Sequence, residues 1–450
     1  MLRSWLAFSL VVPCVLLLAG ACGGSSSGGP STSGPLDEDG GGGGGTGPAG
    51  LPCDVADVLA EHCQKCHASP PQFGAPMPLV TWDDLDAPSR ADPTKKVYEG
   101  VIERVADERR RMPPSPNAPL SDAEQKTIAD WIAAGAPRST DQCGAPTDKP
   151  PPQGLSCTPD LSLEPASAWE MPEAAGDEYV CWGVDLSKEQ ATHVTAFAPV
   201  IDNTEITHHI VLYEAPSAYS RVPTRCNAGS AIAWRMVLGW APGVGPLELP
   251  PEAGFPISTD PAKPTHYVAQ MHYSNPTGKK GATDKSRIDL CTSAPRQHEA
   301  DVMAFGSQSF EIPAAPPAGG RYTIDCALTA PAAFAGLHFF AAMPHMHQIG
   351  VAMSTTLTPA AGGPDVDLGS MSSFSFDSQA WLPVSATLKA GDVIRTSCSW
   401  TNNTGAPVRF GEKTGDEMCY SFSMYYPRIK SSLWSWAAPA SGPPIGATCN

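Results

Sequence analysis

Beyond its first 21 residues the chain lacks any apolar run long enough to cross a bilayer, and it lacks an excess of positive charge. Its 450 residues contain 46 Asp and Glu but only 29 Lys and Arg, which gives a formal net charge of -17. This balance argues against binding to nucleic acid and against electrostatic docking on anionic lipid. Long patterns with the helical period of 3.6 residues are also missing after residue 150, so we do not expect long helices there.

Glycine, proline and cysteine are, by contrast, abundant. The 42 Gly and 48 Pro favour short strands joined by many turns. The length predicts two to three domains at roughly 150 residues each. The 14 Cys are too many for an ordinary cytosolic protein, so the sequence predicts an oxidising compartment.

Residues 1–21 are typical of a secretory signal peptide, with one charge at Arg3, an apolar core and a small-residue end. That end resembles a bacterial lipobox in which Cys22 would carry the lipid; ordinary cleavage nearby is the alternative. Residues 22–50 are almost all Gly, Ser, Pro and Thr, which predicts a flexible tether. Because Gly23 stands where an Asp would indicate inner-membrane retention, we expect an exported lipoprotein on the outer membrane, facing the periplasm or the cell surface. Its only membrane contact would be the lipid.

Cys63, Cys66 and His67 form a C-x-x-C-H motif, which is the attachment pattern of a c-type haem. The two thiols would form thioethers with the porphyrin, and the histidine would supply an axial nitrogen. A redox dithiol and half of a zinc site are the alternatives. The surrounding sequence argues against both of them.

Two expected helices frame this motif. A helical pattern over 54–62 leads into it, and a second helix over 122–134 begins with Ser121 and Glu124 in the positions of a capping box. This layout over residues 51–143 resembles a small class I cytochrome c domain and implies one haem c.

The sixth ligand of such a haem should be a methionine from the loop between the two helices, which would raise the reduction potential. Met112, within Arg111-Met112-Pro113-Pro114, is the residue that we predict. Met77 lies only ten residues past His67 and is the weaker candidate. The alternative is that Met112 only packs against its neighbours and that His67 and a water molecule are the axial ligands of the haem iron.

A proline-rich linker over 146–154 precedes strand-like runs that continue to the end of the chain. We therefore expect a mainly β fold, with two β-sandwich domains over 150–300 and 301–450 after the small helical domain.

Histidines recur on the expected strands of the first sandwich. His208 and His209 are adjacent, so their side chains would leave opposite faces of a regular strand. A bulge or a strand end would be needed for both to bind one metal. Farther along, Gln270 and His272 would share one face of an extended strand.

His345 and His347 are two residues apart, so in an extended strand both imidazoles would point the same way. The apolar segment 336–342 reads as a core strand entering this site, and Met418 follows in Gly415-Asp416-Glu417-Met418-Cys419-Tyr420. Two imidazoles with a thioether suit copper that cycles between Cu(I) and Cu(II) better than zinc. Taken alone, the His pair could instead be a surface feature without a metal.

These stretches, in this order, resemble the copper type II, ascorbate-dependent monooxygenases, the family of peptidylglycine α-hydroxylating monooxygenase and dopamine β-monooxygenase. The resemblance covers about 155–450 and implies two jelly-roll-like sandwiches, each with one copper ion. It implies an electron-transfer copper at His208, His209 and His272, and a catalytic, O2-binding copper at His345, His347 and Met418. Gln270 matches a family position near the first copper, whereas His266 and His338 match no ligand and should be satisfied locally.

The resemblance also implies a disulfide pattern. It pairs Cys157 with Cys291, Cys181 with Cys226, Cys326 with Cys449, and Cys398 with Cys419. Cys53 and Cys143 remain, and because they bracket the helical domain they could close it.

One departure from the family concerns the substrate. Met343 stands where the peptide-hydroxylating members carry an arginine that anchors the substrate carboxylate, and Phe422 and Tyr420 replace its Tyr and Asn helpers. We therefore do not expect peptidylglycine as the substrate. A less polar molecule, aromatic or aliphatic, fits these residues better.

The functional hypothesis is a copper-dependent monooxygenase that hydroxylates a C–H bond of a small organic substrate with O2. Electrons would pass through the fused haem c from an upstream donor, with ascorbate or another external reductant also able to serve. The alternative is a non-enzymatic lipoprotein that binds copper or transfers electrons.

Overall fold

The computed structural model describes most of the chain from residue 50 to residue 429, together with residues 447–449. The gaps within this part are 73–74, 91, 108–110, 115–116, 142, 144–154, 173–175, 227–233, 243, 276–279, 315–319, 377–378 and 412–414. The expected signal peptide, Cys22 and nearly all of the tether lie outside the described residues, so these remain predictions.

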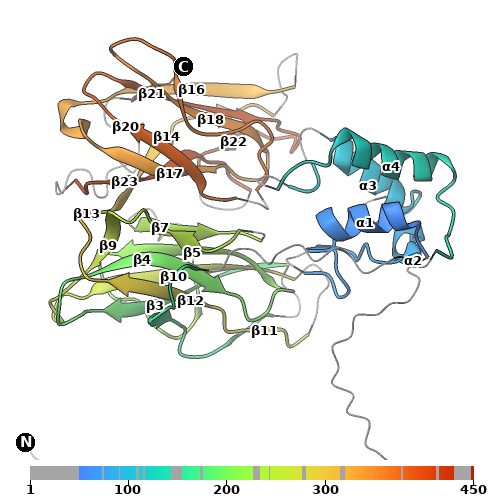
Figure 1. Cartoon of the computed structure of the whole chain (residues 1–450), viewed down its shortest axis with the longest axis horizontal. Helices are drawn as coiled ribbons and strands as arrows, with labels where there is room; N and C mark the ends of the chain where they lie inside the picture. Colours follow the sequence, from blue (N-terminus) through green and yellow to red (C-terminus); the bar gives the residue numbers. More distant parts are fainter. Residues whose placement is uncertain are drawn as a thin grey trace, which may run out of the picture. The chain divides into compact units, whose positions relative to one another are not determined.

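The first part of the described chain contains four helices (Figure 1): α1 (Cys53–His62), α2 (Trp82–Asp86), α3 (Val97–Ala106) and α4 (Asp122–Ala133). None of the helices within the described residues is long and apolar enough to span a membrane. Leu59, Leu85, Val97 and Trp131, one from each helix, are buried in a shared apolar cluster.

The sequence predicts α1 and α4 but not α2 and α3. The capping box of α4 is confirmed, because the Ser121 hydroxyl accepts from the Glu124 N–H and the Glu124 carboxylate accepts from the Ser121 N–H. A second capping box, formed by Thr81 and Asp84, starts α2. That pair was the signal by which α2 could have been found.

The next part of the chain forms a sandwich built from β1 to β13, in which all strand pairs among the described residues are antiparallel except β9 with β13. Its strands are β1 (Leu161–Leu163), β2 (Trp169–Glu170), β3 (Asp177–Leu186), β4 (Thr192–Val200), β5 (Thr207–Ala215), β6 (Thr224–Arg225), β7 (Arg235–Trp240), β8 (Leu247–Glu248), β9 (Ala253–Ile257), β10 (Thr265–Ser274), β11 (Thr283–Asp284), β12 (Arg287–Ser293) and β13 (His298–Glu299). One sheet has the order β1-β12-β4-β9-β13, with β8 beside β4, and the other has the order β6-β3-β10-β5-β7.

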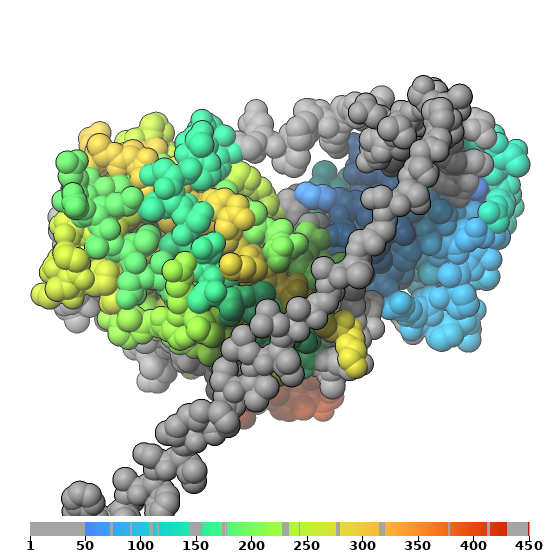
Figure 2. All heavy atoms as spheres, turned by 90° about the horizontal axis from the view of Figure 1, so that it is seen from below, coloured from blue at the N-terminus to red at the C-terminus, as the bar shows by residue number. Residues whose placement is uncertain are grey.

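Buried side chains from both of these sheets form one core, which includes Phe197 of β4 and Leu212 of β5. Since β12 lies between β1 and β4, segments far apart in sequence share a face of this sandwich. In the space-filling view the green residues before 200 and the yellow residues near 290 are accordingly intermixed (Figure 2).

The last part of the chain forms a second sandwich. Its strands are β14 (Asp301–Ser307), β15 (Glu311–Ile312), β16 (Tyr322–Thr329), β17 (His338–His345), β18 (Gly350–Thr358), β19 (Val366–Met371), β20 (Leu382–Thr387), β21 (Val393–Trp400), β22 (Val408–Arg409), β23 (Cys419–Tyr426) and β24 (Ala447–Cys449). The sheet orders are β14-β23-β17-β20 and β19-β18-β21-β16-β24. Burial alternates along β18 and β21, as expected when one face of a sheet covers a core.

The two sandwiches contact each other through β7. Arg235 on β7 donates to Asp301 on β14 at 2.7 Å, and both side chains are almost fully buried. A Cβ atom at Gly239 would lie 2.7 Å from the Met343 sulfur, so β7 packs closely against the end of this β17 side chain. The mainly β architecture predicted from sequence is confirmed.

All five predicted disulfides are present: Cys53–Cys143, Cys157–Cys291, Cys181–Cys226, Cys326–Cys449 and Cys398–Cys419. The first of them joins the two ends of the helical region. Among the described residues, Cys63 and Cys66 are the cysteines that form no disulfide.

Candidate metal centres

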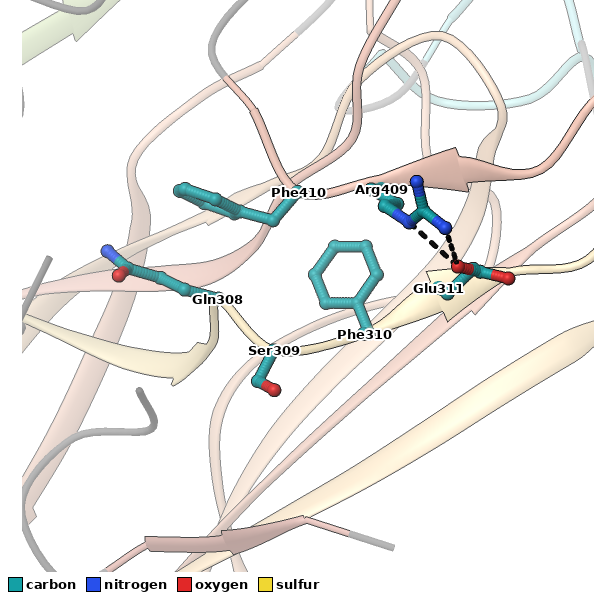
Figure 3. Close-up of a pocket in the computed structure, with 6 residues that line it drawn as sticks. All are labelled: Gln308, Ser309, Phe310, Glu311, Arg409 and Phe410. Carbon is teal, nitrogen blue, oxygen red and sulfur yellow. Dashed lines mark hydrogen bonds and ion pairs between the residues drawn. The ribbon is translucent and has the colours of Figure 1, made fainter. Parts of the chain in front are cut away.

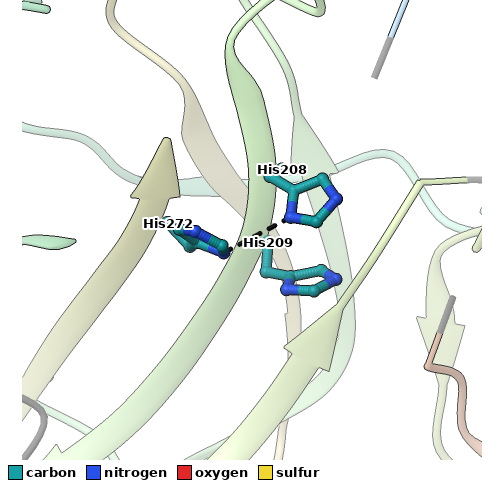
Figure 4. A group of neighbouring side chains, drawn as sticks. All are labelled: His208, His209 and His272. Carbon is teal, nitrogen blue, oxygen red and sulfur yellow. Dashed lines mark hydrogen bonds between the residues drawn. The ribbon is translucent and has the colours of Figure 1, made fainter. Parts of the chain in front are cut away.

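Three histidines converge on two neighbouring strands of the first sandwich (Figure 4). His208 and His209 belong to β5 and His272 to β10, and one ligand nitrogen of each lies within 4.8 Å of the others. The Nδ1 atoms of His208 and His272 are 3.3 Å apart. Two ring nitrogens this close cannot both carry a proton between them, so at least one presents a lone pair, as a metal ligand requires.

A register shift explains how adjacent histidines reach one side of the strand. His272 pairs with His209, but the next residue of β10, Tyr273, pairs with Thr207, so the ladder skips His208. Two residues of β5 thus face one of β10, which is the geometry of a β-bulge and re-aims the extra side chain. Two adjacent histidines need such a bulge, or a strand end, to bind one metal, and the bulge lies at His208.

Neighbouring side chains hold this first centre in place. His272 stacks on Tyr179 of β3 with ring centroids 4.5 Å apart and planes within 4° of parallel. Gln270, two residues earlier on β10, is buried, and its amide donates to the Cys226 sulfur at 4.0 Å. The disulfide from Cys226 to Cys181 therefore supports the strands that carry the centre.

In the second sandwich His345 and His347 face each other, with ring centroids 5.3 Å apart and planes at 86°. The expectation that one strand presents both is wrong in detail, because β17 ends at His345. His347 lies in the turn that follows. Strand alternation therefore explains the position of His345, and other contacts must place His347.

Each of these two imidazoles is oriented through its Nδ1 atom. His345 Nδ1 bonds the Gln379 side-chain oxygen at 2.5 Å, and His347 Nδ1 bonds the Asp416 backbone carbonyl at 3.1 Å. An acceptor at Nδ1 requires the proton there, which leaves the Nε2 lone pair for a metal. Burial, followed by the neighbouring His347, lowers the pKa of His345 to about 3, so this imidazole is neutral at ordinary pH.

Glu417 joins the histidine segment to the segment of Met418. Its fully buried carboxylate accepts from the backbone N–H of His347 at 2.8 Å, Ile349 at 2.9 Å and Met418 at 3.2 Å, and from the Trp400 indole at 3.0 Å. Burial raises the pKa of Glu417 to about 7, and the four donors oppose that shift. Sequence reasoning did not assign Glu417 a role, although an acidic residue in Asp-Glu-Met-Cys just before an apolar strand was a usable signal.

Met418 stands directly before β23, on which Tyr420 pairs with His345 of β17. This ladder brings Met418 to the end of the sheet where His347 lies. The Cys398–Cys419 disulfide fixes the next residue of the strand. Two imidazoles whose Nδ1 atoms are hydrogen-bonded, with a methionine at the adjoining strand end, are donor types that suit copper, as are the three imidazoles of the first sandwich.

The C-x-x-C-H residues lie together in the turn that follows α1, and haem attachment to them stays a prediction. Cys63 and Cys66 are half-buried, and burial raises the pKa of the Cys63 thiol to about 12. His67 Nδ1 bonds the Met77 carbonyl at 2.8 Å, which leaves Nε2 for an iron atom. Because the Met77 backbone lies on the Nδ1 side of His67, its role in the structure is to orient that ring. Met112 as sixth ligand stays a prediction.

The substrate-related positions lie in apolar surroundings. Met343 is buried against Gly239, and Phe422 lies 5.7 Å from the His345 ring, between centroids. Tyr420 stands 5.6 Å from Phe422 and continues this row of aromatic rings to Phe410.

A shallow depression of about 450 Å³ lies at the far end of that row (Figure 3). It is lined by Gln308, Ser309, Phe310, Glu311, Arg409 and Phe410. Its lining contains no histidine of either centre, so this depression is separate from both of them.

The two histidines that were expected to be satisfied locally have near partners. His266 Nδ1 bonds Asp185 at 2.7 Å, and His338 Nδ1 bonds Thr387 at 2.9 Å.

Comparison with known proteins gives two family matches. Residues 165–280 match the copper type II ascorbate-dependent monooxygenase, N-terminal domain, and residues 298–439 match the C-terminal domain of the same family. Together these matches cover more than half of the chain. Against solved structures, a structure of infectious bursal disease virus aligns with 10% identity over 62% of this chain and 76% of that chain, at a TM-score of 0.15, which supports no inference.

Curated relatives agree with the family matches. The chain is similar to DBH-like monooxygenase protein 1 of Gallus gallus, with 29% identity over 53% of this chain and 42% of that protein. It is 28% identical to the Homo sapiens protein of that name, over 54% of this chain and 43% of that protein. It is 24% identical to dopamine beta-hydroxylase of Canis lupus familiaris, over 54% of this chain and 41% of that protein. In each case the chain spans less than half of the relative's length. Both sandwiches carry the histidines expected from the resemblance, and the chain belongs to the copper type II ascorbate-dependent monooxygenase family.

Proposed function

We propose that this chain is a copper-dependent monooxygenase that hydroxylates a C–H bond of a small organic substrate with O2, using electrons relayed through a haem c on its own helical region. The observation that carries the proposal is the pair of imidazole sets, one in each sandwich, in a chain that matches both domains of one family. The proposed ligands are His208, His209 and His272 in the first centre, and His345, His347 and Met418 in the second.

The reaction balances as one substrate, one O2, two electrons and two protons giving one hydroxylated product and one water. Copper at the second centre would supply the activation of O2 and copper at the first centre the second electron. The chain's own residues prepare the site. Gln379 and the Asp416 carbonyl hold protons on Nδ1 of the two histidines, and Glu417 ties their segment to Met418.

The electron relay is supported by a contact between the haem-binding segment and the first sandwich. The Thr204 hydroxyl, in the turn before β5, donates to the Gln72 side-chain oxygen, and the Gln72 N–H donates to the Cys66 carbonyl at 2.8 Å. A haem attached to Cys63 and Cys66 would share one chain with both copper centres. Its effective concentration at these centres would therefore exceed that of a free carrier.

We test this proposal first by metal content and then by O2 consumption. The mature chain should bind two copper ions and one haem iron, and it should consume O2 only when an organic substrate is present. A copper carrier would bind the metal without consuming O2. A chain that retains no copper after reconstitution would overturn the proposal.

A matched variant tests the relay alone. The double change Cys63→Ala and Cys66→Ala should abolish haem attachment and haem-mediated electron delivery, while leaving hydroxylation supported directly by ascorbate. In the unaltered chain, reduced haem should be reoxidised when copper and O2 are supplied. Absence of that reoxidation would contradict the relay.

The substrate proposed is apolar, because Met343, Tyr420 and Phe422 place thioether and aromatic surface near His345. Hydroxylation of a phenyl-substituted alkane or amine, with no turnover of a peptide ending in glycine, is the expected result. Turnover of the glycine peptide would contradict it.

We also propose that the protein is exported and anchored to the outer membrane by a lipid on Cys22. The five disulfides support export, because such bonds persist in oxidising compartments. Cys22→Ala should release the chain into the soluble fraction of cells, without changing its metal content.

A further inference from the structure

One segment of the second sandwich contacts both histidine centres. It lies between β19 and β20 and carries Phe376 and Gln379. The Phe376 ring stands 5.3 Å from the His209 ring at 90°, and 5.7 Å from the His347 ring at 70°, measured between centroids. It also lies 6.4 Å from the ring of His272. One half-buried phenylalanine thus contacts histidines of both centres.

Gln379 connects this ring to the remaining histidine. Its amide nitrogen donates to the Phe376 carbonyl at 3.0 Å, and its side-chain oxygen bonds His345 Nδ1 at 2.5 Å. The segment is held from behind by Phe374, which is buried in the core and whose N–H donates to the Val351 carbonyl at 2.9 Å. Phe376 and Gln379 are therefore tied to the second sandwich by hydrogen bonds and by the packing of Phe374.

We propose that Phe376 and Gln379 are positioning residues that couple the two centres. Phe376 packs an apolar ring against both His209 and His347, and this shared contact limits how far the two imidazoles can move relative to each other. Gln379 makes the position of Phe376 depend on that of His345. The identity of the metals rests on the proposed function, whereas the coupling of the side chains does not.

This arrangement has a thermodynamic consequence. If one ring contacts both centres, a change that reorients the imidazoles of one centre must alter the contact of that ring with the other. Such coupling is reciprocal, so ligand binding at either centre changes affinity at the other by the same factor. Without Phe376, the two centres should behave as independent sites.

The first test uses the metal-free chain, with histidine labelled for NMR. Phe376→Ala should shift the imidazole signals of both His209 and His347, because each loses the ring current of a neighbouring aromatic. Phe376→Tyr keeps the ring and should restore the wild-type signals. Phe340→Ala is the matched control, because Phe340 also lies in the second sandwich and stacks on Tyr426, 5.9 Å between centroids. It should leave both signals in place.

The second test measures the distance between two Cu(II) ions by pulsed dipolar EPR. Wild type and Phe376→Tyr should give one narrow distribution, and Phe376→Ala a broader one. Shifts at only one centre in the NMR experiment, or an unchanged distribution in Phe376→Ala, would overturn the coupling. A wild-type chain that binds no copper would instead overturn the proposed function, and the metal-free NMR comparison would still decide the coupling.

Discussion

The two histidine centres belong to one family architecture but are built in different ways. The first takes all three imidazoles from two hydrogen-bonded strands, and one bulge turns His208 toward the other two. The second has one histidine at a strand end and one in a turn, and a buried carboxylate holds the turn in place. The first centre thus depends on backbone pairing within a sheet, whereas the second depends on side chains that can be removed singly. Substitutions should separate the two centres on that basis.

The largest effect is expected from removing one ligand in each centre. His272→Ala and His345→Ala should each lower bound copper from two ions to one, and the two variants should lose different EPR signals. Loss of a hydrogen-bond partner of a metal ligand lowers metal affinity or activity by roughly 10–100-fold. Loss of the ligand itself should lower the rate of hydroxylation by more than that in both variants. Two copper ions retained in either variant would remove that histidine from the ligand set.

Removing Glu417 should damage the second centre while sparing the first. In Glu417→Ala four buried donors lose their acceptor, each at about 1–3 kcal/mol, so denaturant unfolding should show a loss of several kcal/mol together with loss of the second copper. Glu417→Gln keeps an acceptor oxygen and serves as the milder comparison. Equal copper loss from both centres in Glu417→Ala would contradict the prediction that this carboxylate supports the second centre and not the first.

A smaller effect is expected at Gln379. Gln379→Leu removes the acceptor for His345 Nδ1, and copper affinity at the second centre should fall by about 10–100-fold. Affinity at the first centre should change by less, because Gln379 reaches that centre only through Phe376. Competitive chelator titration would measure this. Gln308→Leu, a glutamine of the same sandwich in the depression of Figure 3, is the control and should leave both affinities unchanged.

The smallest effect is expected for a histidine outside both centres. His266→Ala breaks the partly exposed pair with Asp185, and such surface pairs contribute about 0–1 kcal/mol. Copper content should stay at two ions and thermal unfolding should change little. Loss of a copper ion from this variant would show that His266 contributes to one of the two copper sites.

Much of this molecule could be predicted from its sequence, because the informative signals were local or shared with a family. The C-x-x-C-H motif, the Ser121–Glu124 capping box and the period-two pattern are local in this sense. The five disulfides are confirmed, although the pairing of four of them came from the family resemblance and not from the spacing of the cysteines.

What the sequence could not give depends on contacts between distant segments. The bulge at His208 arises from the pairing of β5 with β10. The alternation of residues along β5 does not reveal that pairing. Glu417 acquires its role because a turn 70 residues earlier in the chain brings the His347 N–H to it. Phe376 contacts both centres only because the sandwiches pack together, and a single phenylalanine in a loop gives no sign of that.

The bulge at His208 also limits where this chain can tolerate insertions and deletions. Deleting one residue between Thr207 and His209 would restore a regular ladder, and the side chains before the deletion would move to the opposite face of the sheet relative to β10. Substitutions near the first centre can be absorbed one at a time, whereas a one-codon deletion at this point would remove a ligand and misplace part of the core. Related chains that keep this centre should therefore show length variation in the loops on either side of β5 and not within it.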